Sequence, residues 1–252
     1  MANPSRIAHA VAPGGEKTAP PPNKQVSPVR YAAAVAALII GGALCYGGAV
    51  QLYAGVLQAR ATTLLGTIDW DKGTTPVAKV VPAINDLRSA DRWWPQPANA
   101  YQRGVAETRL ATQAGKTDLN RALLNTGMGD LRLSIAQDPA NAAAWAWLAY
   151  GLVIEQGASP ATKDALAMSI ELARFEPTLL AMRCEIGLTI YRSLDAQRRA
   201  AVDDQIRMLA RHALWTLASV TRVTHSLDIV MQVLLRGGDN KIITRFMDTL
   251  RS

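Results

Sequence analysis

One uncharged run of residues constrains this chain more than any other feature. From Tyr31 to Ala59 the sequence reads YAAAVAALIIGGALCYGGAVQLYAGVLQA, without a charged side chain. Its strongly polar residues, Gln51 and Gln58, both lie toward its C-terminal end. A helix needs about 20 apolar residues to cross the roughly 30 Å hydrocarbon layer of a bilayer. The run therefore predicts a membrane-spanning helix over residues 31–59, with Tyr31 and Tyr53 near the two interfaces.

The segment before this run is polar and rich in proline, which predicts a disordered tail over residues 1–30. A cleaved signal peptide is the alternative, because Ala59-Arg60-Ala61 has the small-x-small form of a cleavage site. The apolar run is longer than a signal peptide's core, and the tail is longer than its usual basic start. We therefore expect an uncleaved anchor, and cleavage after Ala61 stays open.

The charges around the run predict its orientation, because basic residues concentrate on the cytoplasmic side of a span. Four basic residues precede the run and one acidic residue opposes them: Arg6, Lys17, Lys24 and Arg30 against Glu16. We expect a cytoplasmic N-terminus and a body on the outer side. In a bacterium this means the inner membrane, with the body in the periplasm.

Small residues recur at every fourth position of the run and would form one seam on a helix. They are Ala33, Ala37, Gly41, Cys45 and Ala49. Such seams let helix backbones approach closely in a membrane, which predicts contact with a partner helix or with a second copy of the chain. The alternative is that an alanine-rich span produces the seam by composition alone.

Charge and reactive residues argue against several function classes. The net charge is +7, but the basic residues are scattered among acidic ones and form no nucleic-acid footprint. The three histidines and two cysteines lack metal-ligand spacing, and no phosphate, dinucleotide or hydrolase motif occurs. Asp203 and Asp204 are interpreted as part of a salt-bridged helix face with Arg207 and Arg211. We expect no cofactor, no nucleic acid and no catalytic activity.

Periodicity predicts helices throughout the rest of the chain, and no strand pattern is present. Helices are expected over residues 82–90, 98–113 and 118–137, the last weakened by Gly127 and Gly129. Apolar steps of three and four predict one long helix from Val202 to Val220 and another from Leu227, ended by Gly237-Gly238. The chain is predicted to be all-α, with residues 60–96 as a linker and first helix and 97–252 as a helical domain.

A repeat-like unit lies in the middle of this domain. Asp138-Pro139 recurs as Glu176-Pro177, and Ser159-Pro160 begins a second helix between them, which Pro177 is expected to end. The first helix is apolar nearly all round, as expected for a helix with neighbours on two faces. An irregular helical bundle is the rival arrangement. The predicted core of the unit comprises Trp145, Leu148, Ala149, Leu152, Ala165, Phe175 and Pro177.

These positions resemble the tetratricopeptide pattern of a large aromatic, a leucine three residues later, small residues and a closing proline. Ser169 departs from it where an aromatic is expected, and Arg183 occupies the aromatic position of the next unit. The stretches SIELARFEPTLLAMRCEIGL and LDAQRRAAVDDQIRMLARHALW also resemble bacterial tetratricopeptide-like proteins that accompany exopolysaccharide or O-antigen assembly. The resemblance covers residues 130–215. It implies a scaffold that binds an envelope protein such as a polymerase, ligase or export component.

A second hypothesis concerns DRWWPQP, Asp91 to Pro97. Trp93 and Trp94 could form a platform for sugar rings, because aromatic faces suit them. The alternative is a loop docked onto the helical core through Trp93, since large aromatic side chains dominate core burial.

Overall fold

The computed structural model describes residues 28–70, 77–113 and 117–251, and the described chain is all-α as predicted. The tail prediction for residues 1–27 lies outside the described residues. The contacts divide the chain into two units, Met1–Gly47 and Gly48–Ser252. The helices are α1 (Pro28–Gly66), α2 (Val77–Trp93), α3 (Pro97–Gln113), α4 (Asp118–Gln137), α5 (Ala142–Gln156), α6 (Pro160–Leu172), α7 (Pro177–Ile190), a 3-10 turn η2 (Tyr191–Ser193), α8 (Ala196–His212), α9 (Leu214–Thr224), α10 (Leu227–Gly237) and α11 (Asn240–Arg251).

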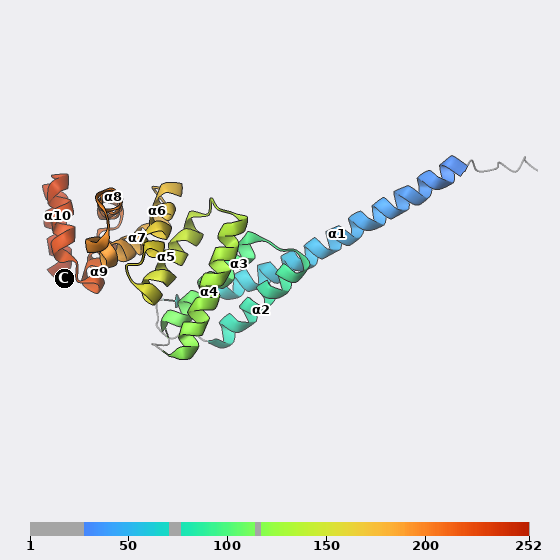
Figure 1. Ribbon diagram of the computed structural model, residues 1–252, viewed down its shortest axis with the longest axis horizontal. Helices are drawn as coiled ribbons and strands as arrows, with labels where there is room; N and C mark the ends of the chain where they lie inside the picture. The colour runs from blue at the N-terminus through green and yellow to red at the C-terminus, as the bar shows by residue number, and fades with distance from the viewer. Residues whose placement is uncertain (1–27, 71–76, 114–116, 252) are drawn as a thin grey trace, which may run out of the picture. The chain divides into compact units, whose positions relative to one another are not determined.

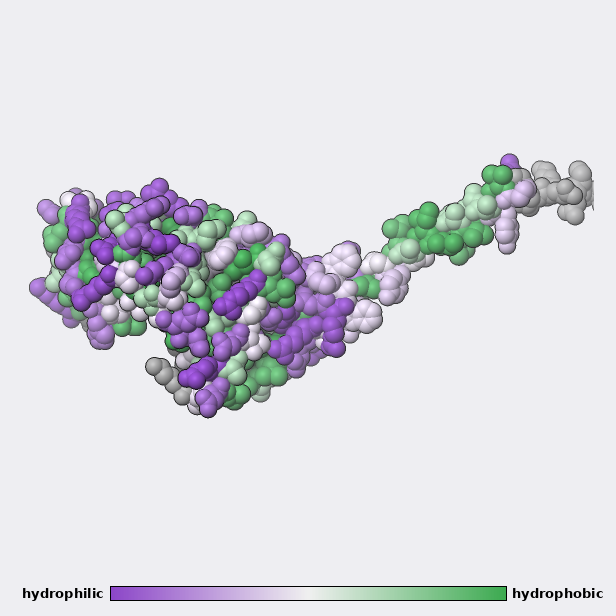
Figure 2. All heavy atoms as spheres, in the orientation of Figure 1, coloured by the Kyte–Doolittle hydropathy of each residue, from purple (hydrophilic) through white to green (hydrophobic). Residues whose placement is uncertain are grey.

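Helix α1 is long and apolar enough to cross a membrane. Its most apolar stretch has a mean hydropathy of 2.0, and none of that stretch is buried within the chain. Figure 2 shows apolar residues along this exposed helix and a mainly hydrophilic face on the body. The helix continues past the predicted end at Ala59 to Gly66. Ala54 and Ala61, seven residues apart, are buried on one face there, so the last turns of α1 belong to the body's packing.

The body, from Gly48 onward, is built from helical hairpins. Helix α3 packs on α4, α5 on α6 and α7 on α8, and α3, α5, α7 and α9 also contact one another in succession (Figure 1). Apolar residues from α3 to α11 form one continuous core cluster. Each inner helix therefore has a hairpin partner and a neighbour from the next hairpin, and whether the hairpins form a true repeat or an irregular bundle stays a prediction. The tetratricopeptide assignment itself stays a prediction.

Helix α5 explains why its sequence is apolar nearly all round. It contacts α3, α4, α6 and α7, so only a narrow strip faces solvent. Its small residues permit this crowding: a Cβ added at Gly151 would lie 2.8 Å from Cγ of Met128 on α4. Leu148, Ala149 and Leu152 are buried as predicted. Trp145 is half-buried, and its indole N–H donates to the carbonyl of Pro139 over 3.0 Å.

The second helix of the unit is shorter than predicted, which corrects two core assignments. Helix α6 ends at Leu172, and Ala165 is buried, but Phe175 lies beyond the helix, 49% exposed, against the ring of His212. Pro177 does not end this helix; it is the first residue of α7. The physical reason is a cap from outside the helix, because Arg183 donates to the carbonyl oxygens of Ser169 and Ala173.

Two further differences concern the C-terminal half and the first helix. The predicted helix from Val202 to Val220 is broken at Ala213, whose backbone leaves the helical region at φ −147° and ψ 71°, giving α8 and α9. Helix α2 spans Val77–Trp93 and is longer at both ends than the predicted helix over residues 82–90. Pro82, expected at its start, therefore lies inside it. The predicted bounds of α4 and α10 are confirmed, and Gly238 ends α10 in the left-handed conformation at φ 71°.

Candidate partner-binding site

A hollow of about 290 Å³ lies where the end of α1 meets α3 and α5. Tyr101, Val105 and Arg109 line it from α3, because residues four apart share one helix face. Trp147 lines it from α5, and Trp70 closes it from the segment after α1. The remaining lining comes from Thr62, Leu65, Gly66, Gln102 and Ala106.

The guanidinium of Arg109 lies between two indole rings in this hollow. Its central carbon is 5.0 Å from the ring centroid of Trp70 and 4.9 Å from that of Trp147. Each contact is a cation–π interaction, worth about 0.5–1 kcal/mol at exposed sites and more when desolvated. The side chain of Gln113 donates to the carbonyl of Trp70 over 2.9 Å and holds that residue in place. The aromatic walls are therefore positioned before any partner arrives.

Burial raises the pKa of the Tyr101 hydroxyl, while the charge of Arg109 and a hydrogen bond with Trp147 act in the opposite direction. The hydroxyl thus remains protonated at neutral pH. The hollow combines aromatic faces, one cation and a neutral hydroxyl. These residue types, Trp, Tyr and Arg, contribute most of the energy in protein–protein interfaces.

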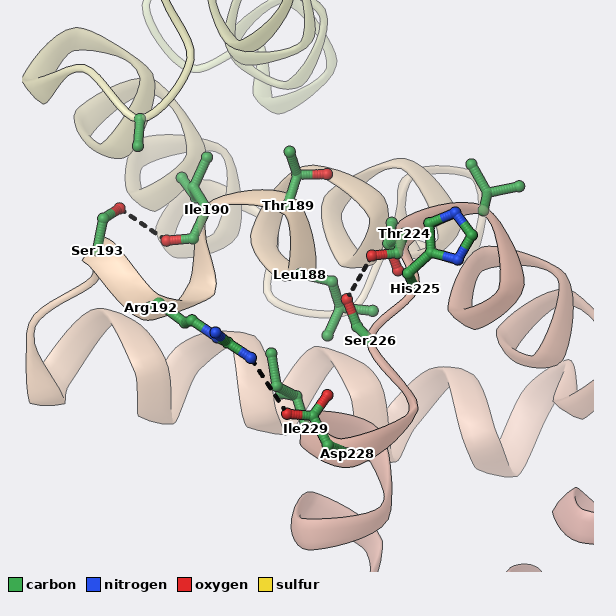
Figure 3. A pocket seen from close by; sticks show the side chains of 12 residues that line it. Leu188, Thr189, Ile190, Arg192, Ser193, Thr224, His225, Ser226, Asp228 and Ile229 are labelled. Carbon is green, nitrogen blue, oxygen red and sulfur yellow. Dashed lines mark hydrogen bonds and ion pairs between the residues drawn. The ribbon is translucent and has the colours of Figure 1, made fainter.

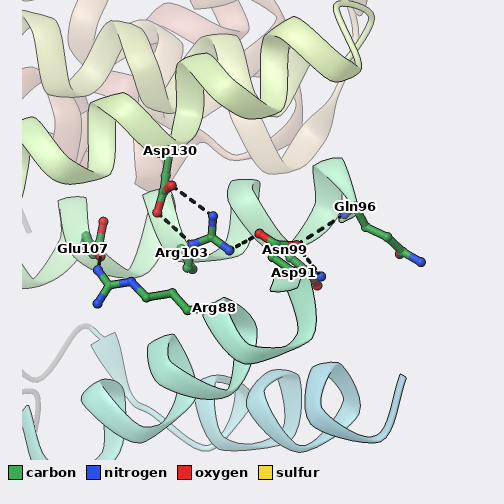
Figure 4. A network of polar contacts seen from close by, with 7 residues as sticks. All are labelled: Arg88, Asp91, Gln96, Asn99, Arg103, Glu107 and Asp130. Atoms are coloured by element: carbon green, nitrogen blue, oxygen red, sulfur yellow. Dashed lines mark hydrogen bonds and ion pairs between the residues drawn. The ribbon is translucent and has the colours of Figure 1, made fainter. Parts of the chain in front are cut away.

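A buried polar network underlies this region and joins α2, α3 and α4 (Figure 4). The guanidinium of Arg103 pairs with Asp91 of α2 and donates to Asp130 of α4 over 2.9 and 3.0 Å. Burial opposes its charge, but the hydrogen bonds that Arg103 donates to Asp130 and Asp91 raise its pKa overall. Asp91 also accepts from the amide N–H of Gln96 and from the side chain of Asn99. One arginine therefore fixes the turn that joins α2 to α3.

Glu107 is the buried acid of the same network. Its Oε1 accepts from Arg88 over 2.7 Å, while its Oε2 has no hydrogen-bond partner among the described residues. Burial raises the pKa of Glu107 to about 7, with a further contribution from the charge of Asp130, and Arg88 and Arg103 oppose the shift. This carboxyl group is therefore poised to titrate near neutral pH.

A second hollow, of about 440 Å³, lies among the ends of α7, η2, α9 and α10 (Figure 3). Arg192 pairs with Asp228 across it, and the hydroxyls of Ser193 and Ser226 donate to nearby backbone carbonyls. His225, at φ 51°, caps α9 in the left-handed conformation. These polar groups are engaged within the chain, so this hollow is a weaker candidate than the aromatic one.

Comparison with protein-family models, curated protein sequences and solved structures found no match.

The structure does not bring the sequence-predicted site residues into the aromatic hollow. Trp93 and Trp94 lie at the end of α2, 51% and 40% exposed, and Trp93 meets Tyr53 of α1 edge-to-face at 6.0 Å rather than the body's main core. The seam residues Ala33, Ala37, Cys45 and Ala49 are exposed and Gly41 is half-exposed.

The sequence did not reveal three residues of the aromatic hollow, and Asp203 and Asp204 do not share the same ion-paired face of α8 as predicted. The three are Trp70, Tyr101 and Arg109, although the last two lie eight residues apart, with Val105 midway between them, and this spacing places Tyr101, Val105 and Arg109 on one helix face. Asp203 accepts from the Tyr191 hydroxyl over 2.6 Å and faces Arg236, whereas Asp204 takes the ion pairs on the exposed face of α8. In the described part of the chain, no group of three His, Cys, Asp or Glu side chains could hold a metal ion.

Proposed function

We propose that this protein is a membrane-anchored, non-catalytic scaffold whose helical body binds a protein partner. The observation that carries the proposal is the Trp70–Arg109–Trp147 hollow, in a chain whose first helix contains a long apolar stretch that is not buried. At about 290 Å³ the hollow is just below the range of small-molecule sites, about 300–1,000 Å³, and suits an anchoring side chain of a partner.

In this proposal α1 crosses a bacterial inner membrane, with the N-terminus in the cytoplasm and the body in the periplasm. The partner belongs to the machinery of exopolysaccharide or O-antigen assembly, as the resemblance of residues 130–215 implies. The seam from Ala33 to Ala49 would pack against a partner's membrane helix or against a second α1. A scaffold for another envelope complex would use the same hollow and the same anchor.

Capture of the full-length tagged protein from solubilised membranes tests the proposal. We expect an envelope-polysaccharide protein to copurify, and Arg109→Ala to weaken its binding at least tenfold, as loss of a hot-spot arginine does. Arg132→Ala is the matched control, because Arg132 is an exposed arginine on α4 outside the hollow. Recovery of no such protein, together with unchanged polymer in a deletion strain, would refute the proposal.

Glycan binding by Trp93 and Trp94 is the alternative function. The high exposure of two adjacent tryptophans favours a surface role over a core role. Titration of the protein with envelope glycans, followed by tryptophan fluorescence, tests this alternative. A spectrum that does not respond to any glycan removes it.

A further inference from the structure

The position of Trp93 along α1 follows from two contacts between α1 and α2. Arg60 pairs with Asp86 over 3.2 Å, and Tyr53 meets Trp93 edge-to-face. The step from Arg60 back to Tyr53 equals the step from Asp86 forward to Trp93, seven residues in each helix. The two helices are therefore antiparallel in this stretch. The end of α2 lies level with Tyr53, about 10 Å along α1 from Arg60.

The exposure of α1 changes at the same level. Before Tyr53 the large apolar side chains of α1 are exposed, including Leu38, Leu44 and Leu52. After it, Ala54 and Ala61 are buried against the body, while Val56, less than one turn beyond Tyr53, is still 58% exposed. The stretch from Tyr31 to Tyr53 covers 22 helical steps, about 33 Å, which matches a hydrocarbon layer of roughly 30 Å. A bilayer that covers the exposed apolar residues thus ends near Tyr53.

The end of α2 and the turn after it present the residue types of a membrane–water interface at this level. Trp93 and Trp94 are exposed neighbours, and Arg92 beside them is an exposed cation. Indole rings favour the interface because they are apolar with one polar N–H, and arginine pairs with lipid phosphate. Two exposed tryptophans in water would leave a large apolar area uncovered.

The turn is also held rigidly in place. The backbone N–H of Trp94 donates to the carbonyl of Ala90 over 2.8 Å. Asp91 accepts from Gln96 and Asn99 and pairs with Arg103, as described above. The two tryptophans are therefore presented by a preorganised turn, so little ordering entropy opposes their insertion.

We propose that Trp93 and Trp94, together with Tyr53, form an interfacial anchor that seats the body on the headgroup layer of the bilayer. The proposal rests on insertion of α1 and adds a second contact with the lipid. It replaces the sugar platform, because the same aromatic faces would be occupied by lipid.

Lipid quenching of tryptophan fluorescence tests this anchor. The full-length protein is reconstituted into phosphatidylcholine vesicles whose acyl chains are brominated either near the headgroups or near the bilayer centre. We expect the shallow bromines to quench more strongly, and Trp93→Phe/Trp94→Phe to remove more than half of that quenching. The control Trp215→Phe, at an exposed tryptophan on α9, should remove none of it. The phenylalanine variants keep the apolar volume, and circular dichroism verifies their fold.

Two results separate the anchor from the insertion of α1. If alkaline carbonate extracts the protein from membranes, the proposed insertion fails. If the protein resists extraction but the double variant is quenched by shallow bromines as strongly as the wild type, only the interfacial anchor is overturned. A fluorescence change with soluble glycans but none with brominated lipids also overturns the anchor, in favour of the sugar platform.

Discussion

Replacement of Arg183 by methionine tests the tertiary contact that ends α6. The side chain of Arg183 is 0% exposed, and burial lowers its pKa to about 10, so it is still charged at neutral pH. Its Nε donates to Oγ of Ser169 over 3.0 Å. Its two terminal nitrogens donate to the carbonyls of Ser169 and Ala173, and more weakly to the side chain of Gln205 over 3.5 Å.

The expected loss of folding stability is the difference between two large effects, the lost hydrogen bonds and the relieved desolvation of the buried cation. Each hydrogen bond from a charged donor contributes about 1.5–3 kcal/mol, and each buried acceptor left unpaired costs about 1–3 kcal/mol. Methionine also removes the desolvation penalty of the buried cation, which is several kcal/mol. Three close hydrogen bonds outweigh this relief, and we expect a net destabilisation of about 3 kcal/mol. For a body of this size that corresponds to a decrease in Tm of roughly 6 to 12 °C.

Thermal unfolding of the full chain in detergent, followed by circular dichroism, measures this effect. Arg132→Met serves as the control, because an exposed arginine on α4 should change stability by less than about 0.5 kcal/mol. Ser169→Ala removes the acceptor of the Arg183 Nε and the donor to the carbonyl of Ala142, so it should cost about 1 kcal/mol alone and less when Arg183 is already methionine. A variant Arg183→Met as stable as the wild type, or additive effects of the two substitutions, would refute the reasoning.

Three further predictions use the same unfolding assay. Gly127→Ala should lower the free energy of unfolding by about 1–3 kcal/mol, because the new Cβ would lie 2.8 Å from Oγ1 of Thr108. The control Gly129→Ala places its Cβ in open space and should raise the free energy of unfolding by about 0.5–1 kcal/mol. Because the pKa of Glu107 rises from 4.5 to about 7 on folding, the body should be most stable below pH 4.5 with respect to this group. At most about 3 kcal/mol is then lost as the pH rises through 7, a loss that Glu107→Gln should abolish, and an unchanged pH profile would contradict this. Trp145→Ala should cost about 2 kcal/mol, since the ring is half-buried and bonded to the chain, and an unchanged Tm would contradict its place in the repeat.

Elements whose signals are local could be predicted from the sequence. Helix α4 starts where Thr117 accepts from the N–H of Asn120, and α10 ends at Gly238, whose positive φ suits glycine. The apolar run of α1 needs no partner to be recognised, because its length and lack of charge are decisive. The two-sided burial of α5 was also visible, since its alanines leave no polar face.

Features set by distant contacts could not be predicted. Helix α6 ends at Leu172 although its apolar spacing continues to Phe175, because its last carbonyls are capped by an arginine on the next helix. The aromatic hollow joins Trp70 and Trp147 through Arg109, and no short-range pattern connects these three positions. Periodicity shows which face is apolar, but not where a neighbouring helix interrupts it.

The contact between Ser169 and Arg183 changes how the departures from the repeat pattern are weighed. Taken singly, a serine and an arginine at aromatic positions are two objections to a repeat. In the structure Arg183 donates to the hydroxyl of Ser169 and, more weakly, to Gln205, whose amide in turn donates to the carbonyl of Arg174 over 2.8 Å. An aromatic at either position alone would remove the bond between these two side chains, whereas Ser169 would keep its hydrogen bond to the carbonyl of Ala142, and Arg183 would keep the carbonyl of Ala173. The two departures from the pattern therefore share one polar contact, at the joint between the hairpins α5/α6 and α7/α8.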